Sequence, residues 1–71
     1  MLEVENVLAV VHVADLGEAA PWYERLLGRP PDRRPMESVV EWQLGVTGGV
    51  QVVRDPERAG KSSLTIGVGD I

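Results

Sequence analysis

The stretch Val10–Pro30, VVHVADLGEAAPWYERLLGRP, has the pattern of a strand followed by a turn and a helix. Its β-branched start suits a buried strand, which we predict over Val7–Val13. Asp15 follows, and Glu18 stands three residues later, a spacing that is typical of a helix N-cap. Gly28 is the expected left-handed stop of the helix, and the prolines after it prevent continuation.

The predicted helix ends at Leu27 and has one apolar face. Pro21 cannot donate a backbone hydrogen bond, so we expect the regular helix to begin only near Glu18 or Ala19. Trp22 and Trp42 are predicted core residues because each can bury a large apolar area. The helical spacing assigns five residues to the packing face: Ala19, Ala20, Tyr23, Leu26 and Leu27.

The second half of the chain alternates between apolar and polar residues with the period of β-strands. Gly48-Gly49 predicts a hairpin turn, and Asp55–Gly60 predicts one helical turn. A short edge strand is possible near Asp32–Arg34, where prolines limit its length. The predicted strands are one within Met36–Gly45, one over Val50–Arg54 and a final one over Ser62–Gly69.

Strand alternation predicts which residues the helix covers. We expect an α+β fold, a mixed sheet of the βαβββ type with one main helix. The residues expected under the helix are Val7, Val11, Val40, Trp42, Leu64, Ile66 and Val68. The residues expected on the opposite face are His12, Glu41, Gln43, Gln51, Ser63 and Thr65. These same six residues are the candidate ligand contacts.

Length and composition restrict the class of protein. The 71 residues suffice for one small domain, and the absence of cysteine excludes disulfides and thiolate metal sites. A net charge of −4 argues against a nucleic-acid partner. No apolar run is long enough to span a membrane, and the N-terminus lacks the pattern of a signal peptide. We therefore expect a cytoplasmic protein without membrane or nucleic-acid partners.

An internal repeat joins the two ends of the chain. Leu8–Leu16 reads LAVVHVADL and Ser63–Ile71 reads SLTIGVGDI, and both end in Val, a small residue, Asp and a branched aliphatic residue. A repeat indicates a structural unit that cannot bury its apolar face alone. We expect residues 1–71 to form one module, with the first strand of a second module at 62–71.

These features together resemble the vicinal oxygen chelate superfamily, which includes glyoxalase I, bleomycin-resistance proteins and extradiol dioxygenases. The resemblance implies one βαβββ module, half of a cup that two modules build around a ligand. Either another chain closes this half cup or the sequence is a fragment of a longer protein. It rests on Val13-Ala14-Asp15-Leu16, on Trp22–Gly28 (WYERLLG), on Glu41-Trp42-Gln43, on the Asp55–Gly60 turn and on Val68-Gly69-Asp70-Ile71.

The resemblance also implies where a divalent metal would bind, namely at Leu8, Gln51 and Ser63. Leucine has no donor atom, and neutral amide and hydroxyl oxygens replace poorly the carboxylate and imidazole that such metals prefer. We therefore predict neither a metal nor another cofactor, with a divalent metal ion as the alternative. His12 can be a general base or an improvised metal ligand beside Glu41. The alternative, which we favour, is a half-buried histidine that hydrogen-bonds locally or to a bound molecule.

Two functions remain open, beside a third possibility, a non-functional or purely structural half-module. The first is metal-free binding of a small molecule in a cup that a second chain completes, as in the bleomycin-resistance branch of the family. The alternative is a metal-dependent lyase, isomerase or dioxygenase that uses His12 and Glu41 or ligands from a partner chain. Whether the protein is an enzyme stays undecided, because this cup supports both kinds of activity. A homodimer is the expected assembly, because the Leu8 and Val10 face of the first strand is apolar.

Overall fold

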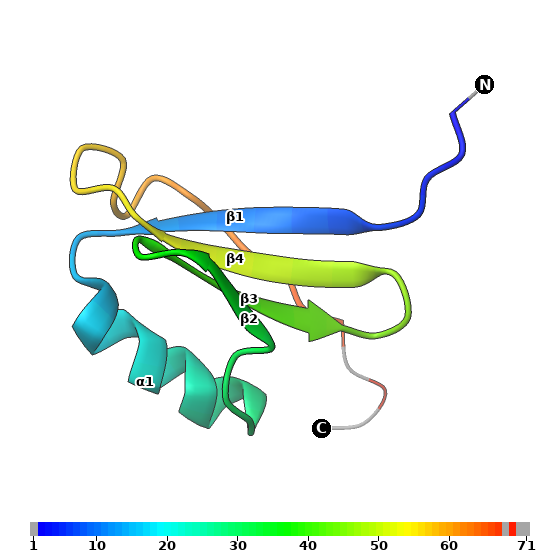
Figure 1. Ribbon diagram of the computed structural model, residues 1–71, viewed down its shortest axis with the longest axis horizontal. Coiled ribbons are helices and arrows are strands. Elements are labelled where there is room, and N and C mark those ends of the chain that lie inside the picture. The colour runs from blue at the N-terminus through cyan, green and yellow to red at the C-terminus, as the bar shows by residue number, and fades with distance from the viewer. Residues whose placement is uncertain (1, 68, 70–71) are drawn as a thin grey trace.

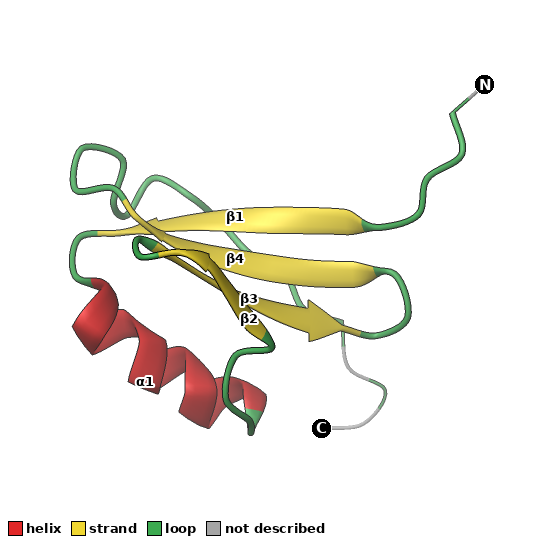
Figure 2. Cartoon of the chain, in the orientation of Figure 1, coloured by secondary structure: helices red, strands yellow, loops and turns green. Residues whose placement is uncertain are grey.

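The computed structural model describes residues 2–67 and 69, and it shows one helix packed on a four-stranded sheet (Figures 1 and 2). The order within the sheet is β1-β4-β3-β2, with β1 parallel to β4 and the other neighbours antiparallel. The predicted α+β fold is therefore confirmed. The elements are β1 (Val7–Val13), α1 (Leu16–Leu27), β2 (Arg33–Met36), β3 (Val39–Leu44) and β4 (Gly48–Arg54).

Helix α1 starts earlier than Pro21 suggested. The Asp15 carboxylate accepts the Glu18 backbone N–H at 3.2 Å, and the Asp15 carbonyl accepts that of Ala19 at 3.0 Å. These bonds fix the first turn, so the helix begins at Leu16 and tolerates the bond that Pro21 cannot make. The expected start near Glu18 or Ala19 was wrong. Gly28, at φ 77°, ends the helix as predicted.

Two large residues of α1 that were predicted to be buried are exposed. Leu26 is 54% exposed and Trp22 is 52% exposed. Both lie off the helical stripe that is centred on Leu16, Leu26 by about 80° around the helix axis. Trp22 instead packs its ring edge against Tyr23, with ring centroids 4.9 Å apart. The residues of α1 that contact the core are Leu16, Ala19, Ala20, Tyr23 and Leu27.

The core lies between α1 and one face of the sheet. Trp42 is fully buried there, and the paired register places it beside Val50. Val7 was expected in this set but is 65% exposed, because it starts β1 at the end of the sheet that α1 does not reach (Figure 1). The buried sheet residues of the core are Val11, Val40, Trp42, Val50 and Val52.

The C-terminal segment does not form the strand that was predicted over Ser62–Gly69. Residues 61–67 have no strand structure, and Val68 lies outside the described residues, as do residues 70–71 of the predicted second module. Leu64 still packs partly buried against the core, whereas Ile66 is 42% exposed. Glycines near the end of the segment disfavour an extended strand, and Leu64 gains cover from the core without one.

The connections differ in detail from the sequence prediction. Gly45, at φ 67°, lies in the turn between β3 and β4, and Gly48-Gly49 belongs to β4 rather than to the turn. Residues 56–60 form consecutive turns instead of a helical turn. The edge strand expected near Asp32–Arg34 is present as β2. Across residues 2–67 and 69, no helix is long and apolar enough to cross a membrane.

Burial separates two substitutions that the sequence made equivalent. Trp42→Ala removes a fully buried side chain and should lower the free energy of unfolding by about 3–5 kcal/mol. Leu26→Ala removes an exposed one and should change it by less than about 0.5 kcal/mol. Urea denaturation followed by far-UV circular dichroism measures both. Equal losses in the two variants would contradict the packing described here.

Candidate functional site

The sheet face opposite α1, here called the open face, carries most of the predicted contact residues. The register places Val10, Gln51 and Glu41 side by side on it, with His12 in the row on one side and Gln43 in the row on the other. The face comprises Leu8, Val10, His12, Val39, Glu41, Gln43, Gly49, Gln51 and Val53.

Ser63 and Thr65 do not join this face. Both are exposed residues of the C-terminal segment, which is not a strand. Thr65 instead lines a groove of about 390 Å³ together with Val7 and Ala9 on the α1 side of the sheet. The predicted set of contact residues is therefore divided, although the ligand-binding role of the residues on the open face remains a prediction.

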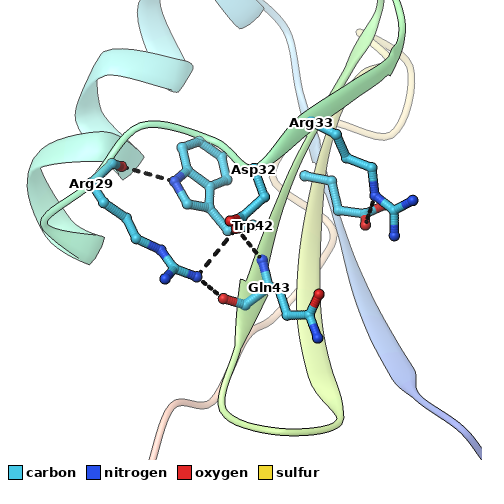
Figure 3. Close-up of polar contacts among 6 residues, drawn as sticks. Arg29, Asp32, Arg33, Trp42 and Gln43 are labelled. Carbon is cyan, nitrogen blue, oxygen red and sulfur yellow. Dashed lines mark hydrogen bonds and ion pairs between the residues drawn. The ribbon is translucent and has the colours of Figure 1, made fainter.

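A polar row formed by Arg33, Glu41 and Gln51 crosses β2, β3 and β4 on the open face. The register pairs Arg33 with Glu41 and Glu41 with Gln51. Arg33 Nε donates to Glu41 Oε2 at 2.7 Å, and Gln51 Nε2 donates to Glu41 Oε1 at 2.8 Å (Figure 3 shows the Arg33 contact). Glu41 is 4% exposed, so a nearly buried carboxylate is held between an arginine and an amide.

The neighbours of Glu41 keep it ionised. The hydrogen bond from Gln51 lowers the pKa of the Glu41 carboxyl most, and the hydrogen bond and charge of Arg33 lower it further. Desolvation acts in the opposite direction and is outweighed. A carboxylate of lowered pKa with both oxygens occupied is suited to ordering its neighbours and is a poor proton donor near pH 7.

A second network fixes β3, and with it Glu41. Trp42 Nε1 donates to the Arg29 carbonyl at 2.9 Å, and the Gln43 backbone N–H donates to Asp32 Oδ2 at 2.6 Å (Figure 3). The Arg29 guanidinium donates to the Gln43 carbonyl and to Asp32 Oδ2. The bond from Gln43, with help from Arg29, lowers the pKa of Asp32. The loop after α1 is thereby fixed to the strand that carries the site.

His12 contacts a residue that sequence analysis did not single out. Its Nδ1 lies 2.9 Å from Ser62 Oγ, and its backbone N–H donates to the same oxygen at 3.3 Å. Val53 is the register neighbour of His12, and Val39 lies beyond it. Glu41 lies two strands across and two residues along from His12, so the two residues are about 12 Å apart. The local hydrogen-bonding role that we favoured for His12 describes its observed contact.

Sequence analysis missed two residues that contact the candidate site, Arg33 and Ser62. Arg33 lies in a proline-bounded tract that is typical of a solvated loop, and its pairing with Glu41 depends on an edge strand of irregular register. Ser62 had no signal, because its contact joins residues 50 positions apart in the chain.

The three residues at which the resemblance implies a metal site, Leu8, Gln51 and Ser63, do not fit a divalent cation. The hydrocarbon side chain of Leu8 covers Gly49, where an added Cβ would lie 2.6 Å from Leu8 Cδ2. Gln51 directs its amide nitrogen at Glu41, and Ser63 lies off the sheet. Within residues 2–67 and 69, no three His, Asp or Glu side chains gather closely enough to hold a metal ion.

The lowered pKa of Glu41 predicts an acid-sensitive contribution to stability. Its folded pKa lies below the unfolded value of 4.5, so this contribution is full above that pH and is lost as the pH falls through the folded pKa. Glu41→Gln should reduce the loss of stability between neutral and acidic pH in urea titrations. Glu57→Gln, in the exposed turn, is the control and should leave the loss unchanged. Equal pH dependence in the parent and Glu41→Gln would contradict the contribution assigned to this carboxylate.

Comparison with known proteins gives one informative match. No protein-family model matches the sequence, and no curated protein matches it. The crystal structure of a glyoxalase/bleomycin resistance protein from Catenulispora acidiphila DSM 44928 matches with a TM-score of 0.75 and 42% sequence identity. The match covers 78% of this chain and 50% of that chain, so the chain spans about half the length of its relative.

The fold and the 42% sequence identity to this relative agree with the family resemblance found in the sequence. The helix cap at Asp15, the stop at Gly28 and the strand order β1-β4-β3-β2 describe one βαβββ module. The chain therefore belongs to the vicinal oxygen chelate superfamily, of which the glyoxalase/bleomycin resistance proteins are members.

Proposed function

We propose that the open face binds a small organic molecule without a metal ion, in a cup that a second chain completes. The observation that carries this proposal is the buried carboxylate of Glu41, which Arg33 and Gln51 hold in place on the open face. A buried charge in this arrangement is costly to maintain and is a frequent feature of binding sites.

The polar row has hydrogen-bonding groups left for a ligand. Arg33 uses only Nε to bind Glu41, and its side chain is 63% exposed. Among the contacts of the described residues, its two terminal nitrogens and the amide oxygen of Gln51 have no partner. A ligand can therefore place an acceptor at Arg33 and a donor at Gln51.

The apolar part of a ligand has a surface beside this row. Leu8 and Val10 are 37% and 41% exposed, and Val10 is the register neighbour of Gln51. An apolar wall with a few polar groups is the usual composition of small-molecule sites. The proposed ligand class is thus a small molecule with one apolar region and at least one oxygen acceptor.

The metal-dependent alternative has less support from the geometry. It needs oxygen or nitrogen donors grouped around one ion, whereas Leu8 offers none and Glu41 is already occupied on both oxygens. A partner chain would have to supply most of the ligands. We therefore place the metal-free function first and keep the lyase, isomerase or dioxygenase as the second candidate.

Metal analysis of the purified protein separates these two functions. We expect inductively coupled plasma mass spectrometry to find no stoichiometric zinc, nickel, manganese or iron. Equilibrium dialysis against Zn²⁺ and Ni²⁺ should then give no saturable site. A stoichiometric metal that is lost in Glu41→Gln would contradict the proposal and favour the enzyme.

Ligand binding is tested with bleomycin, the compound in the name of the relative, as the probe. Its titration should shift the NMR signals of the Gln51 side-chain amide and the Arg33 Nε–H. Gln51→Leu should weaken binding roughly 2- to 10-fold, the usual loss for a hydrogen bond between neutral groups. Glu57→Gln should bind as the parent does. Shifts confined to residues off the open face would contradict the proposed site.

A further inference from the structure

Trp22 is a large aromatic residue that the packing of this domain does not use. Its side chain is 52% exposed and is not among the residues of α1 that contact the core. Its contact with Tyr23 is edge-on, with an interplanar angle of 80°, so Tyr23 leaves at least one face of the indole uncovered. Within the described residues, the indole N–H of Trp42 has a partner in the Arg29 carbonyl, whereas that of Trp22 has none. Trp22 therefore offers an aromatic face to a ligand.

The indole borders a groove between the first turns of α1 and the end of β1, here called the Trp22 groove. Its volume is about 380 Å³, in the lower part of the roughly 300–1,000 Å³ range of small-molecule pockets. Besides Trp22, its apolar lining consists of Val13, Ala14 and Ala19. Val13 is an odd-numbered residue of β1, and the open face carries the even-numbered ones. The Trp22 groove thus lies on the other side of the sheet from the open face.

Two carboxylates give the Trp22 groove a negative charge. Asp15 and Glu18 line it, and no Lys, Arg or His does. Asp15 Oδ1 accepts the Glu18 backbone N–H at 3.2 Å, which leaves Oδ2 free. Within the described residues, neither carboxylate forms an ion pair. The charge of the groove is therefore uncompensated, and its complement is a cation.

The local structure holds these groups in place before a ligand arrives. Glu18 and Trp22 are four residues apart on α1, so their side chains are neighbours on one side of the helix. Asp15 is fixed as the N-cap of α1, and the Trp22 ring contacts Tyr23. An aromatic face beside a carboxylate is thereby formed by a single helix and its cap.

We propose that the Trp22 groove binds a methylated ammonium group, with the cation over the Trp22 indole and beside the Glu18 carboxylate. Among aromatic side chains, Trp attracts cations most strongly through its ring face. The methyl groups of the ligand contact the apolar lining, whereas a metal ion would meet hydrocarbon there in place of the oxygen donors that it needs. This activity is separate from the proposed function, because the two sites use opposite faces of the sheet.

A matched pair of probes tests the recognition of charge. Choline carries a methylated ammonium group, and its neutral isostere has a carbon atom in place of the nitrogen. Titration with choline should give a saturable shift of the Trp22 indole N–H signal in NMR spectra, while the buried Trp42 signal stays unchanged. The neutral isostere should bind roughly 10-fold more weakly. Equal affinities for the two probes, or a choline response confined to the open face, would overturn the site.

Substitutions of Trp22 test the contribution of the aromatic face. Trp22→Leu keeps an apolar side chain and removes the ring, so choline affinity, followed at the Ala14 and Ala19 backbone N–H signals, should fall roughly 2- to 10-fold. Trp22→Phe should lose less. The matched control is Leu26→Ala, an equally exposed position of α1 that does not line the groove, and it should bind as the parent does. Unchanged affinity in Trp22→Leu would overturn the cation–π contact.

Substitutions of the helix carboxylates separate a specific contact from the general effect of net charge. Glu18→Gln should weaken choline binding, because it removes a charge from the groove. Glu24→Gln removes the same charge from α1 at a position that does not line the groove, and it should leave the affinity unchanged. Equal weakening in the two variants would show attraction by net charge alone and would overturn the assigned role of Glu18.

Discussion

The burial of Trp42 is the interaction on which the rest of this structure depends. Its side chain fills the space between β3 and α1, and its indole N–H is satisfied by the Arg29 carbonyl at the end of the helix. Because successive residues of a strand point to opposite faces, burying Trp42 places both Glu41 and Gln43 on the open face. A shift of β3 by one residue would remove the tryptophan from the core and bury its polar neighbours. The core and the candidate site are thus fixed by the same strand register.

The polar contacts strengthen this register from both sides of β3. Asp32 accepts the backbone N–H of Gln43, and its own N–H donates to the Glu41 carbonyl at 2.8 Å. Gln51 and Arg33 then bind the Glu41 carboxylate from the two neighbouring strands. The buried charge at Glu41 is therefore surrounded by bonds that also hold β2, β3 and β4 together, and loss of one partner would leave it uncompensated.

The sequence predicted those parts of the fold whose determinants are local. The Asp15 cap, the Gly28 stop and the alternation of Val40, Glu41 and Trp42 act over a few residues, and the structure agrees with each. Leu26 was misplaced because a wide apolar stripe does not define which of its edges the sheet covers. Trp22 was misplaced because a large apolar side chain is not buried unless its position on the helix faces the sheet. The predicted strand over Ser62–Gly69 was wrong within the described residues because edge pairing depends on tertiary contacts.

The candidate site, like the fold, could be predicted only in part from the sequence. Strand alternation and the family resemblance together grouped His12, Glu41, Gln43 and Gln51. The contacts of Arg33 and Ser62 depend instead on an irregular edge strand and on a loop that returns to β1. Ser63 and Thr65 were assigned to the site through the alternation of the strand predicted over Ser62–Gly69, and residues 61–67 do not form a strand. Neither the repeat nor the family resemblance could predict where the C-terminal segment packs.

Amide hydrogen exchange measured by NMR at several protein concentrations tests the central claim most directly. The proposed function needs a second chain to complete the cup, and β1 is the sheet edge that has no proline and no Asp, Glu, Lys or Arg. Completion at this edge predicts that the Leu8 and Val10 N–H groups exchange quickly in dilute protein and become protected as the concentration rises, while Val11 N–H, directed at β4, stays protected throughout. Rapid exchange of Leu8 and Val10 at every concentration, with Val11 protected, would show that β1 does not pair and would contradict the account.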